Sequence, residues 1–469
     1  MSGILSYGAY LPHFRLDRKS IGDAQGVPGG KGTRAVASFD EDTTSMAVEA
    51  ARSALRGTTA RPAAVYFATA DPGYLDKTNA TALHAALDLP ATAAAYDMLG
   101  SIRSGAGAMR AATDASRPIL VALSDVRTGL PTGADEAGGG DGAAAFLCGP
   151  GSAEQPVIAE LLGWASTSAE FLERWRKPGD RYSKQWEERF GEHAYVPLAD
   201  AAVKAALEQA GVVPGDIAHL VAAGPHGRAV KRAAGAVGVK PESLGDDLLA
   251  TVGNTGTAHA GILLADALDR AEPGAVIVTI WLADGADVAV WRATPALAAH
   301  RAPLPVAAQA KGGGRVSYAS FLTWRGFLDR EPPRRPDPQR PAGPPSFRSE
   351  DWKFAFSGSR CGTCGTRHLP PQRVCVKCHA MDNMTREKLA DVPATIATFT
   401  VDRLAYSLSP PVVAAVIDFD GGGRFQCELT DVDPAAVKIG DRVEMTFRRL
   451  FTAGSVHNYF WKARPLRGR

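Results

Sequence analysis

Four cysteines lie close together near the C-terminal end of the chain, with the spacing of metal ligands. Cys361 and Cys364 form one C-x2-C pair. After ten intervening residues, Cys375 and Cys378 form a second pair. Each pair lets two thiolates reach one ion, and four thiolates complete the tetrahedral sphere of zinc. Because a closed sphere leaves no position for water or substrate, we expect a structural zinc ion; the alternative is a redox-active site, for which one pair would be enough.

Two other residues stand where an apolar segment ends in a turn. His226 follows the apolar segment LVAAGP, and Asn254 lies in the glycine turn VGNTG. Both side chains can donate a hydrogen bond to an oxygen atom. The alternative for each is structural, a loop histidine satisfied by the backbone or a turn asparagine chosen for its conformation.

The composition is that of an ordinary globular protein. The chain has 469 residues, of which 45% are hydrophobic and 22% charged, and a formal net charge of +2. These values exclude a disordered chain and a strongly basic nucleic-acid binder, and the length predicts two or three domains. We find no leader-like N-terminus and no apolar run of membrane-spanning length, so we expect a cytoplasmic protein without membrane insertion.

Residues 1–310 alternate apolar strand-like runs with alanine-rich helical patterns, which is typical of an α/β domain. Three elements recur after about 155 residues, which predicts a duplication with halves at about 1–155 and 156–310. The first two pairs are AVEAARSAL with AVKAALEQA and YFATADP with LVAAGPH; the third is SGAGAMRAATDA with HAGILLADALDR. Chance similarity between alanine-rich units is the alternative.

The last third of the chain divides into three pieces. Residues 311–348 predict a short docked helix and a Pro/Arg-rich linker without regular structure. Residues 349–385 hold the cysteines and predict a zinc ribbon. Residues 386–469 contain short β-rich segments between turn residues and predict a small β-barrel.

The motifs SYGAYLPHFRLDR, FDEDTTSMAVEAA, YLDKTNATALHAAL, WRKPGDRY, FGEHAYV and VGNTGTAHAG together resemble the thiolase-fold hydroxymethylglutaryl-CoA synthases, particularly the archaeal type. From about residue 315 the chain resembles the zinc-ribbon and OB-fold proteins that accompany thiolase-like enzymes as separate subunits. The resemblance implies an α/β, duplicated five-layer thiolase-like fold followed by a zinc ribbon and a small OB-type β-barrel. It also implies an acyl-CoA substrate, with coenzyme A as part of that substrate.

The resemblance places His226 and Asn254 at the family histidine and asparagine that position a thioester. It places Asp71 near the family glutamate, where its shorter side chain puts the acid/base role in doubt. Tyr195 matches a segment that lines the active site, and His259 follows Asn254 at the start of an expected helix. A structural role is an alternative for each of these three residues.

The position of the family's nucleophilic cysteine holds no cysteine. Ser101 or Ile102 stands there, depending on a one-residue gap. A serine alkoxide at a helix N-terminus is much harder to form than a thiolate, so an acyl-enzyme is doubtful. The isolated Cys148 and Cys427 are more typical of small core residues than of a displaced nucleophile.

Three functions remain open at this point. The first is an aldol or retro-aldol enzyme that makes or breaks a carbon–carbon bond on a CoA thioester without an acyl-enzyme, as in related retro-aldolases that lack the cysteine. The second is a hydroxymethylglutaryl-CoA synthase-like acyltransferase that uses Ser101. The third is a non-catalytic scaffold that channels thioesters. The resemblance also implies a homodimer, with other thiolase-like enzymes as further partners, and we expect no nucleic acid.

Overall fold

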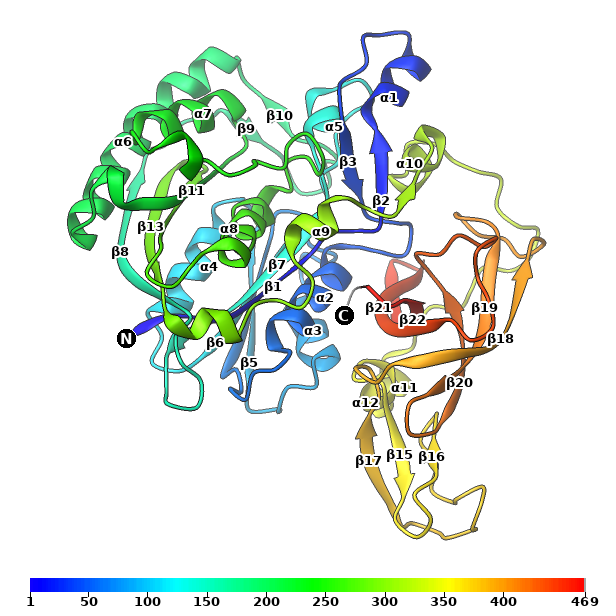
Figure 1. Ribbon diagram of the computed structural model, residues 1–469. Helices are drawn as coiled ribbons and strands as arrows, with labels where there is room; N and C mark the ends of the chain where they lie inside the picture. The colour runs from blue at the N-terminus through cyan, green and yellow to red at the C-terminus, as the bar shows by residue number, and fades with distance from the viewer. Residues whose placement is uncertain (468–469) are drawn as a thin grey trace.

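A computed structural model describes residues 1–467, and Figure 1 shows a large α/β body with a β-rich region beside it. Within the described chain, nine strands form the main sheet in the order β11-β12-β13-β8-β1-β7-β6-β4-β5. In that order their bounds are Ile217–Ala223, Val276–Leu282, Gly285–Ala293, Ala159–Ser168, Ser2–Tyr10, Gly142–Pro150, Ile119–Asp125, Ala64–Thr69 and Ala94–Leu99. Most of these strands are apolar along their whole length because helices cover both faces of the sheet.

The two halves of the sheet repeat one pattern of strand directions. In the first half β4 is parallel to β6, while β6–β7 and β7–β1 are antiparallel. In the second half β11 is parallel to β12, while β12–β13 and β13–β8 are antiparallel. Strands β1 and β8 join the halves through the pairs Gly3↔Glu160 and Ile4↔Ala159. The duplication expected from the sequence is therefore present in the topology.

The helices that repeat in the sequence occupy matching layers. Helix α2 (Thr43–Leu55) and α3 (Ala80–Ala86) pack on the outer face of the first half. Helices α4 (Ser104–Thr113) and α8 (His259–Arg270) lie between the halves in one apolar cluster. Helices α6 (Glu188–Ala210) and α7 (Gly227–Ala236) cover the second half. The described elements thus stack in five layers.

Among residues 1–467, the second half has no counterpart of β5. Strand β11 pairs with β12 on one side, and on its other side only an isolated bridge joins Leu220 to Leu244. Short elements complete this body: the sheet β14-β2-β3, the pair β10-β9, and three helices. Their bounds are Gly314–Arg315, Phe14–Asp17 and Thr33–Val36, then Lys184–Gln185 and Arg174–Trp175, then α1 Arg18–Gln25, α5 Ala134–Gly138 and α9 Val306–Ala310.

The linker is partly helical, which corrects the expectation of no regular structure. Helix α10 (Tyr318–Trp324) docks on β2 and β3 as expected, but α11 (Gly343–Arg348) and α12 (Glu350–Lys353) follow within or beside the proline-rich stretch. Proline is compatible with the first turn of a helix because the N–H that it lacks has no partner there. Prolines at the start of α11 therefore do not prevent that helix.

The C-terminal region consists of a small sheet and a closed barrel. Strands β16 (Arg367–His368), β15 (Ser357–Cys361) and β17 (Met384–Lys388) form the small sheet, and of the four clustered cysteines only Cys361 lies on one of these strands. The barrel closes in the order β18-β19-β20-β22-β21, with bounds Ala394–Asp402, Val412–Phe419, Arg424–Leu429, Val456–Pro465 and Arg442–Ala453. Figure 1 shows the barrel against the side of the α/β body that carries α2.

Buried charges join the barrel to the body. Arg448 is fully buried and reaches Glu41 at 2.8 Å and Asp431 at 2.8 Å. Arg464 reaches Glu49 of α2 at 2.7 Å, and Lys462 reaches Asp40 at 3.0 Å. These three cations are therefore paired with buried carboxylates inside the molecule. Among residues 1–467, no helix combines the length and the apolar character that a membrane crossing requires.

Candidate functional site

Most of the candidate catalytic residues follow strands or precede helices, and they come from both halves of the sheet. Asp71 follows β4, Ser101 lies between β5 and α4, and His226 lies between β11 and α7. Asn254 lies in the turn that leads into a short 3-10 segment before α8. The carboxyl ends of parallel strands are where α/β proteins hold ligands, because loops and helix N-termini converge there.

His226 caps a helix and thereby has a defined tautomer when neutral. It is the N-cap residue of α7, and its Nδ1 accepts a hydrogen bond from the backbone N–H of Ala229 at 3.1 Å. A ring nitrogen that accepts carries no proton, so the neutral imidazole carries its proton on Nε2. The side chain is buried, and the ring of Tyr195 lies 6.2 Å away between centroids.

The amide of Asn254 is oriented by the backbone on both sides. Its Nδ2 donates to the carbonyl oxygen of Gly224 at 2.8 Å, and its Oδ1 accepts from the N–H of Gly256 at 2.9 Å. Gly224 is two residues before His226, so this contact ties the asparagine turn to the histidine loop. An Nδ2 amide has two hydrogens, and the bond to Gly224 uses one of them.

Asp125, which the sequence analysis did not single out, joins the first half to the asparagine turn. It is fully buried at the end of β6. Its Oδ1 accepts from Thr69 Oγ1 at 2.9 Å and from the N–H of Ala70 at 2.7 Å, and its Oδ2 accepts from the N–H of Thr257 at 2.7 Å. A carboxylate directly after the apolar run ILVAL was the available signal for it.

Asp71 lies at the edge of this arrangement in an ion pair. Its side chain is 42% exposed, and Oδ1 lies 3.3 Å from Arg176. Arg176 also donates to the carbonyl oxygen of Ala70. Loss of hydration among the surrounding protein atoms raises the pKa of Asp71, and the positive charge of Arg176 lowers it by a smaller amount. The structure therefore places a charged partner on the carboxyl that the resemblance offered as acid/base.

Ser101 has no activating base among the described hydrogen bonds. Its Oγ accepts from the backbone N–H of Arg103 at 3.1 Å. Arg103, a residue missed by the sequence analysis, donates to Asp287 at 2.9 Å and to the carbonyl oxygens of Asp284 and Thr167 at 2.8 Å each. These bonds attach the start of α4 to the second half of the sheet. The segment around Ser101 therefore helps to hold the two halves in place.

Tyr195 and His259 are both held by backbone groups. The Tyr195 hydroxyl accepts from the N–H of Asp284 at 3.3 Å, and burial raises its pKa. His259 is buried, and its Nδ1 lies 3.4 Å from the backbone nitrogen of Thr255. Burial lowers the pKa of His259 to about 4, so its ring is neutral at physiological pH. The geometry of His259 favours the structural alternative.

The two isolated cysteines lie in strands, and Cys148 is buried whereas Cys427 is half-buried. Cys148 is fully buried in β7, and burial raises its pKa to about 12. Burial likewise raises the pKa of Cys427 in the barrel to about 12. Thiols with such pKa values are poor nucleophiles.

The four clustered cysteines lie as a metal site requires. Their Sγ atoms are all within 4.8 Å of one another, at 3.6 Å for Cys361–Cys378 and 3.5 Å for Cys364–Cys375. With Zn–S bonds of about 2.3 Å, tetrahedral thiolates lie about 3.8 Å apart, so the donor set fits zinc. No disulfide joins cysteines in the described part of the chain.

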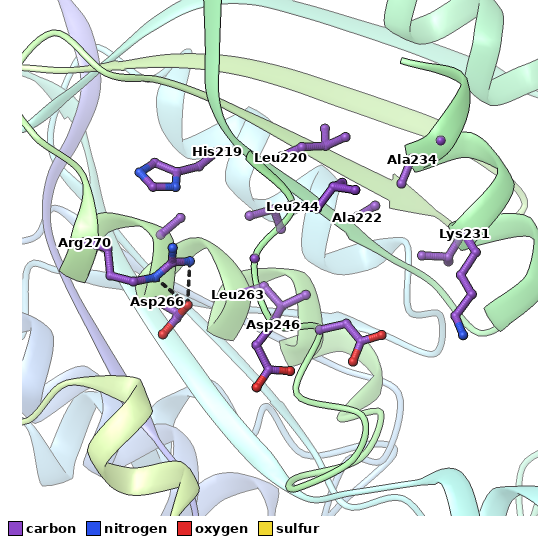
Figure 2. A pocket seen from close by; sticks show the side chains of 16 residues that line it. His219, Leu220, Ala222, Lys231, Ala234, Leu244, Asp246, Leu263, Asp266 and Arg270 are labelled. Atoms are coloured by element: carbon purple, nitrogen blue, oxygen red, sulfur yellow. Dashed lines mark hydrogen bonds and ion pairs between the residues drawn. The ribbon is translucent and has the colours of Figure 1, made fainter. Parts of the chain in front are cut away.

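A separate cavity of about 240 Å³ opens beside β11, where the second half lacks its outer strand. Figure 2 shows its apolar floor, including Leu220 and Leu263, and the ion pair of Arg270 with Asp266 at 2.8 Å. None of the candidate catalytic residues lines this cavity. We therefore do not assign the chemistry to it.

Comparison with known proteins agrees with this arrangement. A hydroxymethylglutaryl-CoA synthase of Pyrobaculum neutrophilum is 30% identical over 351 residues, covering 70% of this chain and 97% of the relative. The chain belongs to the hydroxymethylglutaryl-CoA synthase family. The Aeropyrum pernix synthase is 31% identical over 300 residues, covering 61% and 82% of the two chains. Membership confirms an enzyme of the synthase-like transferase type and supports the acyltransferase alternative of the sequence analysis better than the aldolase.

Solved structures share the thiolase-like fold of this hydroxymethylglutaryl-CoA synthase homologue. The structure "MvaS in complex with 3-hydroxy-3-methylglutaryl coenzyme A" is 21% identical, with a TM-score of 0.57 and coverage of 72% and 94%. A 3-oxoacyl-(acyl carrier protein) synthase III from Pseudomonas aeruginosa is also 21% identical, with a TM-score of 0.55 and coverage of 63% and 98%. Residues 355–382 match the ChsH2 rubredoxin-like zinc ribbon domain, and residues 387–448 match the ChsH2 C-terminal OB-fold domain. The expected fold class is confirmed.

Proposed function

We propose that this enzyme binds a CoA thioester at His226 and Asn254 and makes or breaks a carbon–carbon bond beside the thioester, in a hydroxymethylglutaryl-CoA synthase-like reaction. The observation that carries the proposal is the bond from Asn254 Nδ2 to the carbonyl of Gly224, which holds two side-chain donors on adjoining loops. Donors fixed in advance stabilise the negative charge that develops on a thioester oxygen when its α-carbon becomes an enolate.

The carbon–carbon step has a simple proton balance. A base removes a proton from the α-carbon of the acyl thioester, and the enolate carbon adds to the carbonyl of the second substrate. The resulting alkoxide then takes up a proton and becomes a hydroxyl group. Cleavage is the same sequence in reverse.

The surroundings of Ser101 favour an aldol or retro-aldol reaction without an acyl-enzyme as the second candidate. An acyl-enzyme on serine needs a base that removes the hydroxyl proton. Within residues 1–467, the hydrogen bond recorded for the Ser101 hydroxyl is the one that it accepts from the N–H of Arg103. The aldol step uses the enolate donors and an acid/base group but requires no nucleophile.

Replacing His226 tests the proposal, and asparagine is the sharper substitution. Asparagine is a good N-cap residue, so His226→Asn preserves the start of α7 while it removes the Nε2 donor. We expect His226→Asn and His226→Ala to lower turnover of acetoacetyl-CoA plus acetyl-CoA, or of hydroxymethylglutaryl-CoA cleavage, by about 10²–10³. Unchanged activity in both variants would contradict the proposal and favour a thioester-channelling scaffold.

Replacing Ser101 separates the two candidates. If the reaction forms no acyl-enzyme, the Ser101→Ala variant should retain most of the wild-type activity. Mass spectrometry of the wild-type enzyme incubated with acetyl-CoA should then show no covalent adduct. A dead Ser101→Ala enzyme together with an acetyl adduct on Ser101 would establish the acyltransferase.

We also propose one structural zinc per chain and a homodimer. The thiolate spacing supports the zinc, which would hold the ribbon together and take no part in the reaction. The open edge of β5 supports the dimer: β5 pairs with β4 alone in the described sheet, and Tyr96 on it is 57% exposed. Other thiolase-like partners and a cytoplasmic location stay predictions from the sequence.

A further inference from the structure

A buried carboxyl group next to His226 has no role in the contacts described above. Glu173 directly precedes β9, and only 3% of the residue is exposed. Its Oε2 has no hydrogen-bond partner among the described residues. Burying a polar oxygen without a partner costs about 1–3 kcal/mol, so an unpaired group of this kind calls for a functional explanation.

Glu173 and His226 pack against the same glycine. A Cβ at Gly191 would lie 2.8 Å from Cγ of Glu173, 2.6 Å from Cδ2 of His226 and 3.0 Å from its Nε2. A side chain at this position would force its neighbours to shift, so glycine lets the Glu173 side chain and the imidazole edge pack around the same point. The edge in question is the Nε2 edge, which carries the proton of the neutral ring.

Burial leaves Glu173 easier to protonate than an ordinary glutamate. Burial raises its pKa, and the charges of Asp284 and Asp135 raise it further, whereas His226 and Arg174 lower it. Arg174 also forms an ion pair with Asp135, so its positive charge is divided between two carboxyl groups. A carboxyl that titrates nearer to neutral pH is suited to both taking and returning a proton.

Asp71 differs from Glu173 in its exposure and in its ion-pair partner, although burial raises the pKa of both carboxyl groups. The carboxyl of Asp71 is paired with Arg176, and its side chain is 42% exposed. The charge of His226 acts on the pKa of Glu173, whereas the charges that act most on the pKa of Asp71 are those of Arg176 and Asp125. The two carboxyl groups therefore make a natural pair for comparison.

We propose that Glu173 is the acid/base residue of this site: it removes a proton from the α-carbon of a thioester held at His226 and Asn254, and it returns that proton to the new alkoxide. In cleavage it takes the hydroxyl proton as the carbon–carbon bond breaks and gives it to the enolate carbon. The assignment rests on the proposed function.

Exchange of acetyl-CoA protons with solvent tests the first step by itself. Wild-type enzyme and acetyl-CoA are incubated in D₂O, and deuterium in the acetyl group is measured by mass spectrometry. We expect Glu173→Gln to lower the exchange rate by about 10²–10³, within the usual range for a general base. Glu173→Asp should retain an intermediate rate, and the dissociation constant of acetyl-CoA should change less than about threefold, since the thioester donors remain.

The pH profile separates a base from a residue that only supports the fold. The wild-type exchange rate should rise with pH as the base loses its proton, and this limb should be absent in Glu173→Gln. Glu192→Gln is the matched control, because Glu192 is a neighbouring glutamate that is bound to Arg232 at 2.7 Å; its profile should match the wild type.

Two results would overturn the assignment. A Glu173→Gln enzyme with normal exchange and a normal pH limb, together with an Asp71→Asn enzyme that has lost both, would give the role to Asp71. A wild-type enzyme that binds acetyl-CoA without exchange would leave the CoA site standing but remove the acid/base step from Glu173. A wild-type enzyme that does not bind acetyl-CoA would remove the proposed function itself.

Discussion

At the scale of single residues, the buried carboxylates of this protein have two different structural roles. Asp125 accepts three hydrogen bonds from elements of both halves and thereby holds loops near the candidate site. Glu49 is also buried, but it pairs with Arg52 at 2.8 Å and Arg464 at 2.7 Å. The first residue positions backbone, whereas the second joins the α/β body to the barrel.

The pairing of Glu49 predicts a loss of stability in acid. Burial alone would raise the pKa of Glu49, but Arg464 and Arg52 outweigh it and lower the pKa from 4.5 to about 2. A carboxyl with a lowered pKa stabilises the fold above its unfolded-state pKa, and this contribution is lost as the pH falls from 4.5 towards 2. Glu49→Gln should therefore lower the unfolding free energy by about 2–4 kcal/mol at pH 7 and by much less at pH 3.

Urea unfolding at several pH values measures this difference. Glu154→Gln is the control, because Glu154 is exposed on the surface of the same body. A Glu49→Gln difference that stays constant from pH 7 to pH 3 would contradict the pairing.

At the scale of elements, the zinc ribbon has little apolar core of its own. Its strands β15, β16 and β17 are short, and Cys364 and Val376 are exposed. A unit of this size usually needs a metal to fold, because too little apolar surface is buried. A zinc ion bound by the four thiolates would supply the folding free energy that the small apolar core lacks.

Loss of zinc should unfold this ribbon while the barrel remains. Elemental analysis should give one zinc per chain, and Cys364→Ser or a strong chelator should abolish it. Hydrogen exchange should then accelerate in residues 357–388, and change little in the barrel strands. Cys427→Ser, which alters a cysteine outside the cluster, should keep its zinc. Protein without zinc, or with two disulfides among the four cysteines, would contradict the site.

At the scale of the whole molecule, the two edges of the main sheet have different surroundings. Beside β11 an isolated bridge and the cavity of Figure 2 stand where a fifth strand would lie. At the other edge β5 is complete but lacks a further partner in the described chain. Open edges pair readily with another strand, which favours β5 as the contact between two copies.

Light scattering tests the dimer. We expect a particle of two 49.2 kDa chains at micromolar concentration. Tyr96→Lys, which places a charge on the open edge, should shift the equilibrium towards monomer. Tyr406→Lys is the control, because Tyr406 is similarly exposed at 49% but lies in the barrel region. A wild-type monomer would count against the dimer, and a dimer that persists in Tyr96→Lys would place the contact elsewhere.

The sequence by itself determined the features that depend on local spacing and repetition. The C-x2-C pairs predicted a metal cluster because ligands in one turn need only local geometry. The repeat of about 155 residues predicted two similar halves because each repeated pattern folds into the same kind of element. His226 and Asn254 could be selected because their motifs match the histidine and asparagine that the family resemblance implies.

Only the tertiary structure decided contacts between residues far apart in the chain. Nothing in the local sequence brings Glu173 beside His226, because that contact depends on Gly191 in another element. Burial likewise lowers the pKa of His259 to about 4, and this residue begins a helix in an apolar layer that the packing of both halves creates. The acidic run after Ser38 became a docking surface for Arg448 and Lys462 for the same reason, since buried charges are stable only where the fold supplies their partners.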